Sequence, residues 1–193
     1  ESIPVAQFYQ INVDYDTPFN VYGGMQDNGN WSGPAYTWKR GGIRTLYWQY
    51  LVGGDGFYIA PDIENSRFGF GTSQNGDLYR YDKLTGYYQS ISPQAPNKNT
   101  PLRFNWNAAI AQDPFDKKTV YYGSQYVHKS IDKGANWKII SPDLTTNNTE
   151  YQKGDYGGLT LDISGAENYT SILAIAPSHL DKEIIWVGTD DGQ

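Results

Sequence analysis

The feature that most constrains how this chain folds is a pattern of two short apolar segments that recurs four times. In each copy a turn joins the two segments, and the second segment ends in glycine. The first segments cover residues 11–13, 58–60, 109–111 and 174–176, and the closing residues are Gly24, Gly71, Gly123 and Gly188. These glycines are 47, 52 and 65 residues apart. Repeats of about 40–50 residues are typical of β-propeller blades, which are four-stranded antiparallel sheets, so the pattern predicts an all-β propeller.

The residue types within the repeats also favour strands over helices. The 21 glycines and 10 prolines interrupt every window that is long enough for a helix. The second copy predicts a complete blade with strands over 57–60, 67–72, 77–81 and 87–91, and Asn75-Gly76 is a strong hairpin-turn signal within it. We expect further inner strands over 107–111 and 171–176, third and fourth strands over 126–130 and 136–140, and a long loop over 30–34.

The repeats predict a single propeller segment with blades over 3–50, 51–92 and 104–142 and a partial blade over 171–193. Such a partial blade leaves the backbone groups of residues 184–187 unpaired on one side, which is costly where they are buried. We therefore expect the remaining blades of a larger parent propeller, or another copy of the chain, as a partner. The alternative is a closed four-bladed ring in which residues 3–9 complete the last blade, although Pro4 lacks the amide that a strand ladder needs.

The composition excludes several classes of partner and chemistry. The 21 acidic and 15 basic residues leave a net charge of −6, which argues against a nucleic acid partner because phosphate binding needs a basic face. There is no cysteine, and the two histidines, His128 and His179, neither form a multi-histidine metal centre nor show the spacing of a hydrolase triad. No apolar run approaches the roughly 18 residues that a membrane span needs.

We expect no cofactor and no metal. The alternative is calcium bound to a loop, because the chain contains two aspartate pairs that are also common in ordinary turns. These pairs are Asp14 with Asp16 and Asp190 with Asp191.

One short motif is more specific than the repeat itself. The segment from Ser130 to Trp137 has the form S-x-D-x-G-x-x-W, which is an Asp box. In a hairpin between the third and fourth strands, Asp132 can accept hydrogen bonds from its own turn, Gly134 can adopt a positive φ, and Trp137 can pack into the blade. The motif therefore predicts a structural rather than a catalytic role for Asp132.

With this motif and these repeats, the chain resembles the bacterial sortilin-like and Asp-box (BNR) repeat β-propellers, which are related to xyloglucan-hydrolase-type propellers. The matching segments are 22–29, 53–57, 73–76, 103–107 and 121–144. The resemblance implies a propeller of seven to ten blades, of which this chain would hold about three and a part. It also implies a secreted, periplasmic or cell-surface protein of bacterial origin.

The resemblance leaves two functions open, because such propellers are peptide receptors in one branch and glycan hydrolases in another. Our first hypothesis is a non-catalytic binding module for a peptide or glycan. The alternative is a glycoside hydrolase of the xyloglucanase or sialidase type that acts on a polysaccharide. Two carboxylates facing each other across an open cleft would favour the hydrolase.

Two aspartates in glycine-rich loops are the candidate catalytic residues. Asp27 lies in Gln26-Asp27-Asn28-Gly29, and Asp55 lies in Gly53-Gly54-Asp55-Gly56. A glycosidase needs its two carboxylates about 5–10 Å apart, one as acid and one as base or nucleophile. The competing interpretation is that both are turn residues that bond the backbone nearby.

Aromatic, arginine and amide side chains complete the predicted binding surface. Tryptophan faces are platforms for sugar rings, and arginine can clamp a carboxylate with two hydrogen bonds. Against this role, Trp48 and Trp106 are of the type that fills the space between blades. The predicted ligand-binding residues are Gln26, Asp27, Asn28, Trp31, Arg44, Trp48, Asp55, Gln74, Arg103, Asn105 and Trp106.

Overall fold

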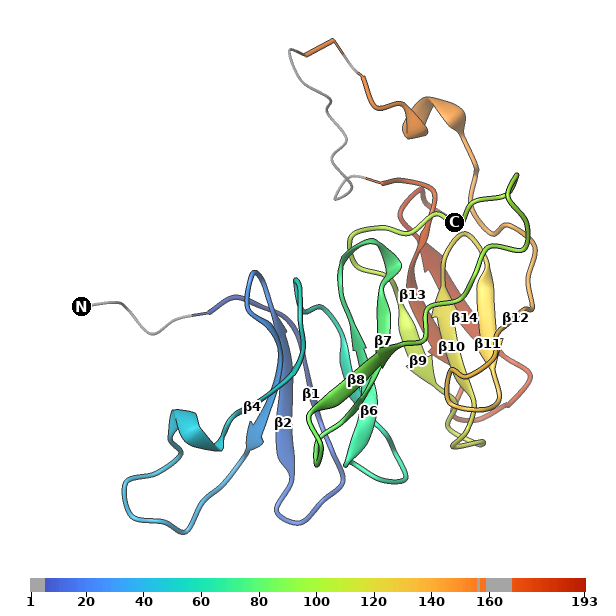
Figure 1. Cartoon of the computed structure of the whole chain (residues 1–193). Helices are drawn as coiled ribbons and strands as arrows, with labels where there is room; N and C mark the ends of the chain where they lie inside the picture. Colours follow the sequence, from blue (N-terminus) through green and yellow to red (C-terminus); the bar gives the residue numbers. More distant parts are fainter. Residues whose placement is uncertain (1–5, 156, 159–167) are drawn as a thin grey trace. The chain divides into compact units, whose positions relative to one another are not determined.

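The structure, a computed structural model, describes residues 6–155, 157–158 and 168–193. Within these residues the chain is all-β, with three antiparallel four-stranded sheets, one antiparallel two-stranded sheet and three short 3-10 helices (Figure 1). Each four-stranded sheet is a meander, in which strands that follow one another in the sequence are also neighbours in the sheet. None of the helices in the described ranges is long and apolar enough to cross a membrane.

The first sheet contains β1 (Phe8–Val13), β2 (Asn20–Met25), β3 (Gly29–Pro34) and β4 (Gln49–Val52). The second contains β5 (Ile59–Pro61), β6 (Phe68–Thr72), β7 (Leu78–Asp82) and β8 (Tyr87–Ser90). The third contains β9 (Ile110–Gln112), β10 (Val120–Gly123), β11 (Val127–Ser130) and β12 (Lys138–Ile139), and β13 (Ile172–Pro177) pairs with β14 (Ile185–Thr189). The helices are η1 (Thr45–Tyr47), η2 (Gln74–Gly76) and η3 (Thr149–Gln152).

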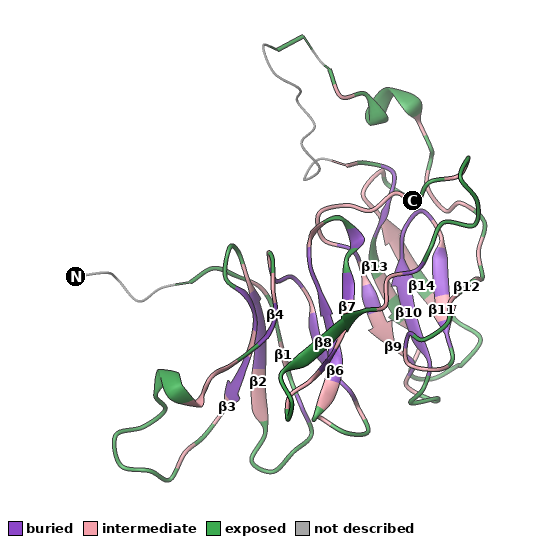
Figure 2. Cartoon of the chain, viewed as in Figure 1, coloured by how far each residue is buried: buried purple, intermediate pink, exposed green. Residues whose placement is uncertain are grey.

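The chain divides into two compact units, each with a core of its own. The first unit comprises residues 1–73 and 77–90 and holds the first two sheets, and the second comprises 74–76 and 91–193 and holds the other two. In Figure 2, β10 and β11 are buried along most of their length, whereas β8 is exposed. The core of the first unit joins Tyr22, Leu51, Val52, Ile59 and Tyr81, and that of the second joins Tyr121, Val127 and Ile172.

Glycines allow the first sheet and the connection between β4 and β5 to approach at backbone distance. A Cβ atom at Gly24 would overlap the carbonyl group of Gly56, and one at Gly56 would overlap the carbonyl group of Gly29. The amide of Gly56 also donates a hydrogen bond to the carbonyl of Met25 at 3.0 Å. The chain therefore crosses from the first sheet to the second directly against the β2–β3 turn.

The repeats share a local device at the end of their first strands. Asp14 follows β1 and accepts a hydrogen bond from the Tyr22 hydroxyl of β2 at 2.8 Å. Asp113 follows β9 and accepts one from the Tyr121 hydroxyl of β10 at 2.7 Å. Asp62, after β5, accepts two backbone amides of its own turn, as Asp113 also does. A carboxylate thus closes the same turn in three sheets, which is independent evidence for the repeat.

The predicted strands are confirmed to within a few residues. The strands expected over 57–60, 67–72, 77–81 and 87–91 correspond to β5, β6, β7 and β8. Those expected over 107–111, 126–130, 136–140 and 171–176 correspond to β9, β11, β12 and β13. Asn75 and Gly76, predicted as a turn, have φ values of 61° and 81° and join β6 to β7.

The prediction of a long loop over 30–34 is wrong. These residues lie in β3, which pairs with β2 from Gly29 opposite Met25 to Pro34 opposite Asn20. Glycine and polar residues in this segment gave no strand signal in the sequence. The glycines are nevertheless suited to the strand, because Cβ atoms at Gly29 and Gly33 would overlap the rings of Tyr50 and Trp48.

The alternative in which residues 3–9 complete the last blade stays a prediction. Phe8 and Tyr9 belong to β1, the first strand of the first sheet, where Phe8 lies opposite Met25. Residues 3–5 lie outside the described residues.

Candidate functional site

A pocket of about 400 Å³ lies among loops of the second unit. In an antiparallel meander, the loop before the first strand and the loop between the second and third strands lie at the same end of the sheet. This arrangement brings the segments before β9 and β13 together with the β10–β11 turn. The pocket is lined by Asn75, Leu102, Arg103, Phe104, Gln152, Asn168 and Tyr169.

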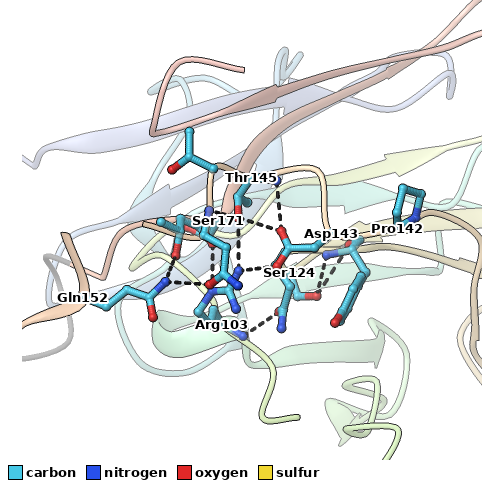
Figure 3. A network of polar contacts seen from close by, with 12 residues as sticks. Arg103, Ser124, Pro142, Asp143, Thr145, Gln152 and Ser171 are labelled. Atoms are coloured by element: carbon cyan, nitrogen blue, oxygen red, sulfur yellow. Dashed lines mark hydrogen bonds and ion pairs between the residues drawn. The ribbon is translucent and has the colours of Figure 1, made fainter. Parts of the chain in front are cut away.

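Arg103 joins the loops that form one wall of this pocket (Figure 3). Its Nη2 donates to Asp143 Oδ2 at 2.7 Å and to Thr145 Oγ1 at 3.1 Å, and its Nε donates to the carbonyl of Thr170 at 3.1 Å. Its backbone amide donates to Gln125 Oε1 at 2.8 Å. The Arg103 side chain is only 21% exposed, so the ion pair is largely shielded from water.

The same contacts set the charge of Asp143. Burial alone would raise its pKa, but hydrogen bonds from Thr145 and Arg103 outweigh burial and lower the pKa below its ordinary value. Arg103 and Asp143 therefore remain an ionised pair, and Arg103 acts chiefly as a positioning residue.

A second set of hydrogen bonds ties the segment before β9 to the segment before β13. Asn105 Nδ2 donates to the carbonyl of Asn168 at 2.9 Å and to Asp190 Oδ2 at 3.1 Å. In return, Asn168 Nδ2 donates to the carbonyl of Phe104 at 3.2 Å. Asp190 also accepts the backbone amide and the hydroxyl of Ser171 at 3.0 and 2.9 Å. In these contacts Asn105 holds the walls of the pocket together.

The pocket offers amide oxygens and aromatic rings. Gln152 Nε2 donates to Asn147 Oδ1 and Thr170 Oγ1, both at 2.9 Å. The amide nitrogens of Gln152 and Asn168 thus donate within the protein, whereas Gln152 Oε1 and Asn168 Oδ1 accept no hydrogen bond from a described residue. Tyr169 is 48% exposed. Acceptors next to an exposed ring suit a ligand that is rich in hydroxyl groups.

Asp27 and Asp55, the candidate catalytic residues, lie together in the first unit. Asp55 Oδ1 accepts a hydrogen bond from the backbone amide of Asp27 at 2.8 Å. Asp27 itself has a φ of 60°, in the left-handed region that glycine, asparagine and aspartate tolerate best. The carboxylate of Asp55 therefore closes the β2–β3 turn, a contact that fits the interpretation as turn residues.

Other predicted ligand-binding residues belong to the same turn. Asn28 Nδ2 donates to the carbonyl of Gln26 at 3.0 Å, and Trp31 Nε1 donates to the carbonyl of Asn28 at 2.6 Å. The Trp31 ring meets Tyr50 edge to face, with centroids 5.3 Å apart. Gln26 and Asn28 are exposed, so this turn is a second accessible surface.

Arg44 and Trp48 are separated from that turn. Both lie in the β3–β4 connection, which is at the opposite end of the first sheet because the whole of β3 runs between them and the β2–β3 turn. The ring of Trp48 packs against Gly33. Within the first sheet, Arg44 and Trp48 therefore lie apart from Asp27 and Asp55.

Gln74 and Trp106 are both partly buried, Gln74 at the start of η2 and Trp106 in the segment before β9. Neither is among the described residues that line the pocket. Of the lining residues, reasoning from the sequence predicted only Arg103 and missed the other six, which are Asn75, Leu102, Phe104, Gln152, Asn168 and Tyr169. The one signal was Tyr169, an aromatic residue just before a predicted inner strand.

The turn from Ser130 to Trp137 uses its polar atoms internally. Asp132 Oδ1 accepts the Ser130 hydroxyl and the Asn136 amide, both at 2.8 Å. Gly134, with a φ of 90°, donates its amide to Ser130 Oγ at 2.8 Å. Trp137 Nε1 donates to the carbonyl of Ile91 at 2.6 Å. These contacts fix the conformation of the hairpin.

A serine–histidine pair lies in the interior of the second unit. Ser124 Oγ and His128 Nε2 are 2.8 Å apart, and His128 is 1% exposed. Burial lowers the pKa of His128 to about 4, because the charged imidazolium is poorly solvated there. A substrate has no access to a pair at this depth, so it serves packing.

The aspartate pairs considered for calcium also accept hydrogen bonds from the protein. Asp191 Oδ2 accepts the amide and hydroxyl of Thr146, and Asp16 Oδ2 accepts the hydroxyl of Ser66. Among the described residues, no group of three or more histidine, aspartate or glutamate side chains is arranged to hold a metal.

No protein-family model and no curated protein sequence matches the chain. Its fold is similar to that of a solved structure, the GH74 xyloglucanase from Xanthomonas campestris, with a TM-score of 0.55 and 13% sequence identity. The similarity covers 90% of this chain and 24% of the xyloglucanase chain, so the chain spans about a quarter of that protein's length. At this identity the similarity concerns the fold alone: all-β, built from antiparallel sheets like those of a propeller.

Proposed function

We propose that the chain is part of a sortilin-like, Asp-box β-propeller that binds a glycan or peptide without catalysis. In this proposal the sheets are blades, and the remaining blades come from a parent propeller or from another copy of the chain. The four-stranded meanders and the fold similarity to a xyloglucanase support the proposal. We place the protein outside the bacterial cytoplasm, as a secreted, periplasmic or cell-surface module, with no cofactor.

The observation that carries the binding function is the lining of the pocket in the second unit. Gln152 and Asn168 direct their amide nitrogens into the protein, which leaves their oxygens for hydroxyl donors, and Tyr169 supplies an exposed ring. The described lining contains no carboxylate. These features favour a glycan over a charged peptide, with Arg103, Asn105 and Asp143 as the supporting framework.

A glycan array followed by titration calorimetry tests this proposal. We expect a neutral oligosaccharide to bind, and Tyr169→Ala to weaken binding about tenfold through loss of ring stacking. Tyr87→Ala, an exposed tyrosine of the first unit, is the matched control and should bind normally. Binding that Tyr169→Ala leaves unchanged would place the ligand elsewhere, and selection of a peptide rather than a glycan would change the ligand class.

The alternative function is a glycoside hydrolase, because the chain shares its fold with an enzyme described as a xyloglucanase. In that case Asp27 and Asp55, which meet in one turn, would be the acid and the base or nucleophile. A reducing-sugar assay on xyloglucan distinguishes the two functions. Sugar release that Asp55→Asn and Asp27→Asn both abolish would replace the binding module with an enzyme.

A further inference from the structure

The connection between β3 and β4, residues 35–48, exposes large apolar side chains. Trp38 is 88% exposed and Leu46 is 74% exposed, and Tyr36 and Ile43 are also exposed. Figure 2 shows the connection around η1 as exposed along most of its length. We call residues 35–48 the β3–β4 loop.

The β3–β4 loop is also strongly basic within an acidic protein. Lys39, Arg40 and Arg44 lie in it, and the sequence has no acidic residue between Asp27 and Asp55. All three are exposed, and none forms an ion pair with a described residue. A charge of +3 is thus concentrated on a chain whose net charge is −6. An anionic surface is electrostatically complementary to this loop.

The loop holds its own shape. In η1, the amide of Tyr47 donates to the carbonyl of Arg44 at 2.9 Å, and the Trp48 amide donates to the Thr45 carbonyl at 3.0 Å. Trp48 anchors the loop by packing on Gly33. Tyr36 and Trp38 meet edge to face, with centroids 4.8 Å apart. The side chains that remain in water are therefore presented by an ordered loop.

The composition of the loop identifies the kind of anionic surface. Residues 35–48 contain no asparagine, glutamine, aspartate or glutamate, the side chains that normally hold sugar hydroxyls. The side chains of Ile43 and Leu46 are aliphatic and provide no aromatic ring on which a sugar could stack. Tryptophan and leucine beside lysine and arginine are the residues of proteins that bind at the membrane interface. We propose that the β3–β4 loop binds the surface of a membrane that contains anionic lipids.

In this arrangement Trp38 and Leu46 enter the interfacial region, and Lys39, Arg40 and Arg44 contact the lipid phosphates. The loop lies at the opposite end of the first sheet from the β2–β3 turn, so lipid binding leaves that turn accessible. The inference does not depend on the proposed glycan pocket, which belongs to the other unit.

Vesicle co-sedimentation of the full chain tests the proposal. One set of vesicles is phosphatidylcholine alone, and the other has two parts phosphatidylcholine to one part phosphatidylglycerol. We expect binding only to the second set, weakened by added salt because exposed charges are screened. Arg40→Ala should weaken binding about fivefold, and Trp38→Ala about tenfold.

Matched controls separate the loop from general surface effects. Trp186→Ala removes an exposed tryptophan of the second unit, and Lys182→Ala removes an exposed lysine there, and both should bind vesicles normally. Circular dichroism melting checks that each variant folds. If Trp38→Ala does not fold, Arg40→Glu, at an exposed position, replaces it as the test variant.

Equal binding to both vesicle sets, or loop variants that bind normally, would overturn the proposal. The proposal would also be overturned if the chain bound soluble polygalacturonate through Trp38 and did not bind vesicles. Glycan binding measured on the same Trp38→Ala protein keeps the two proposals distinguishable.

Discussion

The carboxylate of Asp55 accepts a hydrogen bond from the backbone amide of Asp27, across 28 positions of the sequence. This bond closes the β2–β3 turn from outside. We expect Asp55→Ala to lower the free energy of unfolding by about 1–3 kcal/mol, because the Asp27 amide loses its acceptor. Asp27→Asn should change it little, since asparagine also tolerates a φ of 60°. Urea unfolding measures both. Equal losses in the two variants would show that the Asp27 side chain, not the bond to its amide, holds the turn.

The contact between β2 and the β4–β5 connection predicts the effect of a single methyl group. Gly24→Ala places a Cβ atom on the carbonyl group of Gly56, so backbone has to move, and we expect a loss of about 1–3 kcal/mol. Gly154→Ala is the control, because no atom lies near its Cβ position. Thermal melting compares the two. A Gly24→Ala protein as stable as the control would mean that Gly24 and Gly56 do not approach as described.

Burial of His128 predicts loss of stability in mild acid. Its pKa is about 4 in the folded chain and about 6.5 in the unfolded chain, so the unfolded chain takes up the proton first. The contribution of neutral His128 is complete above pH 6.5 and falls as the pH drops toward 4, by roughly 3 kcal/mol in all. Urea unfolding at successive pH values should therefore show a flatter profile for His128→Gln.

Protonation of aspartates with a lowered pKa, such as Asp113, also destabilises the folded chain in acid, but it does so equally in the wild type and in His128→Gln. The difference between the profiles therefore isolates His128. His179→Gln, which replaces an exposed histidine, is the matched control variant. Identical slopes for wild type and His128→Gln would contradict the prediction.

The ion pair of Arg103 and Asp143 predicts coupled losses. Arg103→Lys keeps the charge but not the planar group that reaches Asp143, Thr145 and the Thr170 carbonyl together, so we expect a loss of about 1–3 kcal/mol. Asp143→Asn should cost a similar amount. In the double variant the losses should be less than additive, because both changes break the same contact. Strict additivity in denaturant unfolding would show that the pair is not coupled.

The fold was predictable where local chemistry dictates the backbone. Asn75-Gly76 forms a turn because both residues tolerate positive φ, and the neighbouring β6 and β7 follow from it. The strand β3 was hidden because its glycines serve packing against Tyr50 and Trp48, residues that follow later in the chain. A local pattern carries no information about such a partner.

The candidate site was predictable only in part for the same reason. Arg103 and Asn105 were predicted for the binding surface from their residue types. Their partners Asp143, Asn168 and Asp190 lie 40 to 85 positions away, so only the folded chain brings them together. The side-chain amide of Asn168 is likewise held by the carbonyl of Phe104, 64 positions away, rather than by its own sequence neighbours.

The glycine contact between the first sheet and the β4–β5 connection separates positions whose side chains can vary from positions that must stay glycine. At Gly24 and Gly56 the nearest neighbours are main-chain atoms, and at Gly29 the carbonyl oxygen of Val52 lies as close as the ring of Tyr50, so no second substitution can create the missing space. The exposed tip beside them, at Gln26 and Asn28, has no such restriction on its side chains. The β2–β3 turn is thus a natural position for a randomised library, in which new surfaces can be selected at the tip while three invariant glycines keep the scaffold intact.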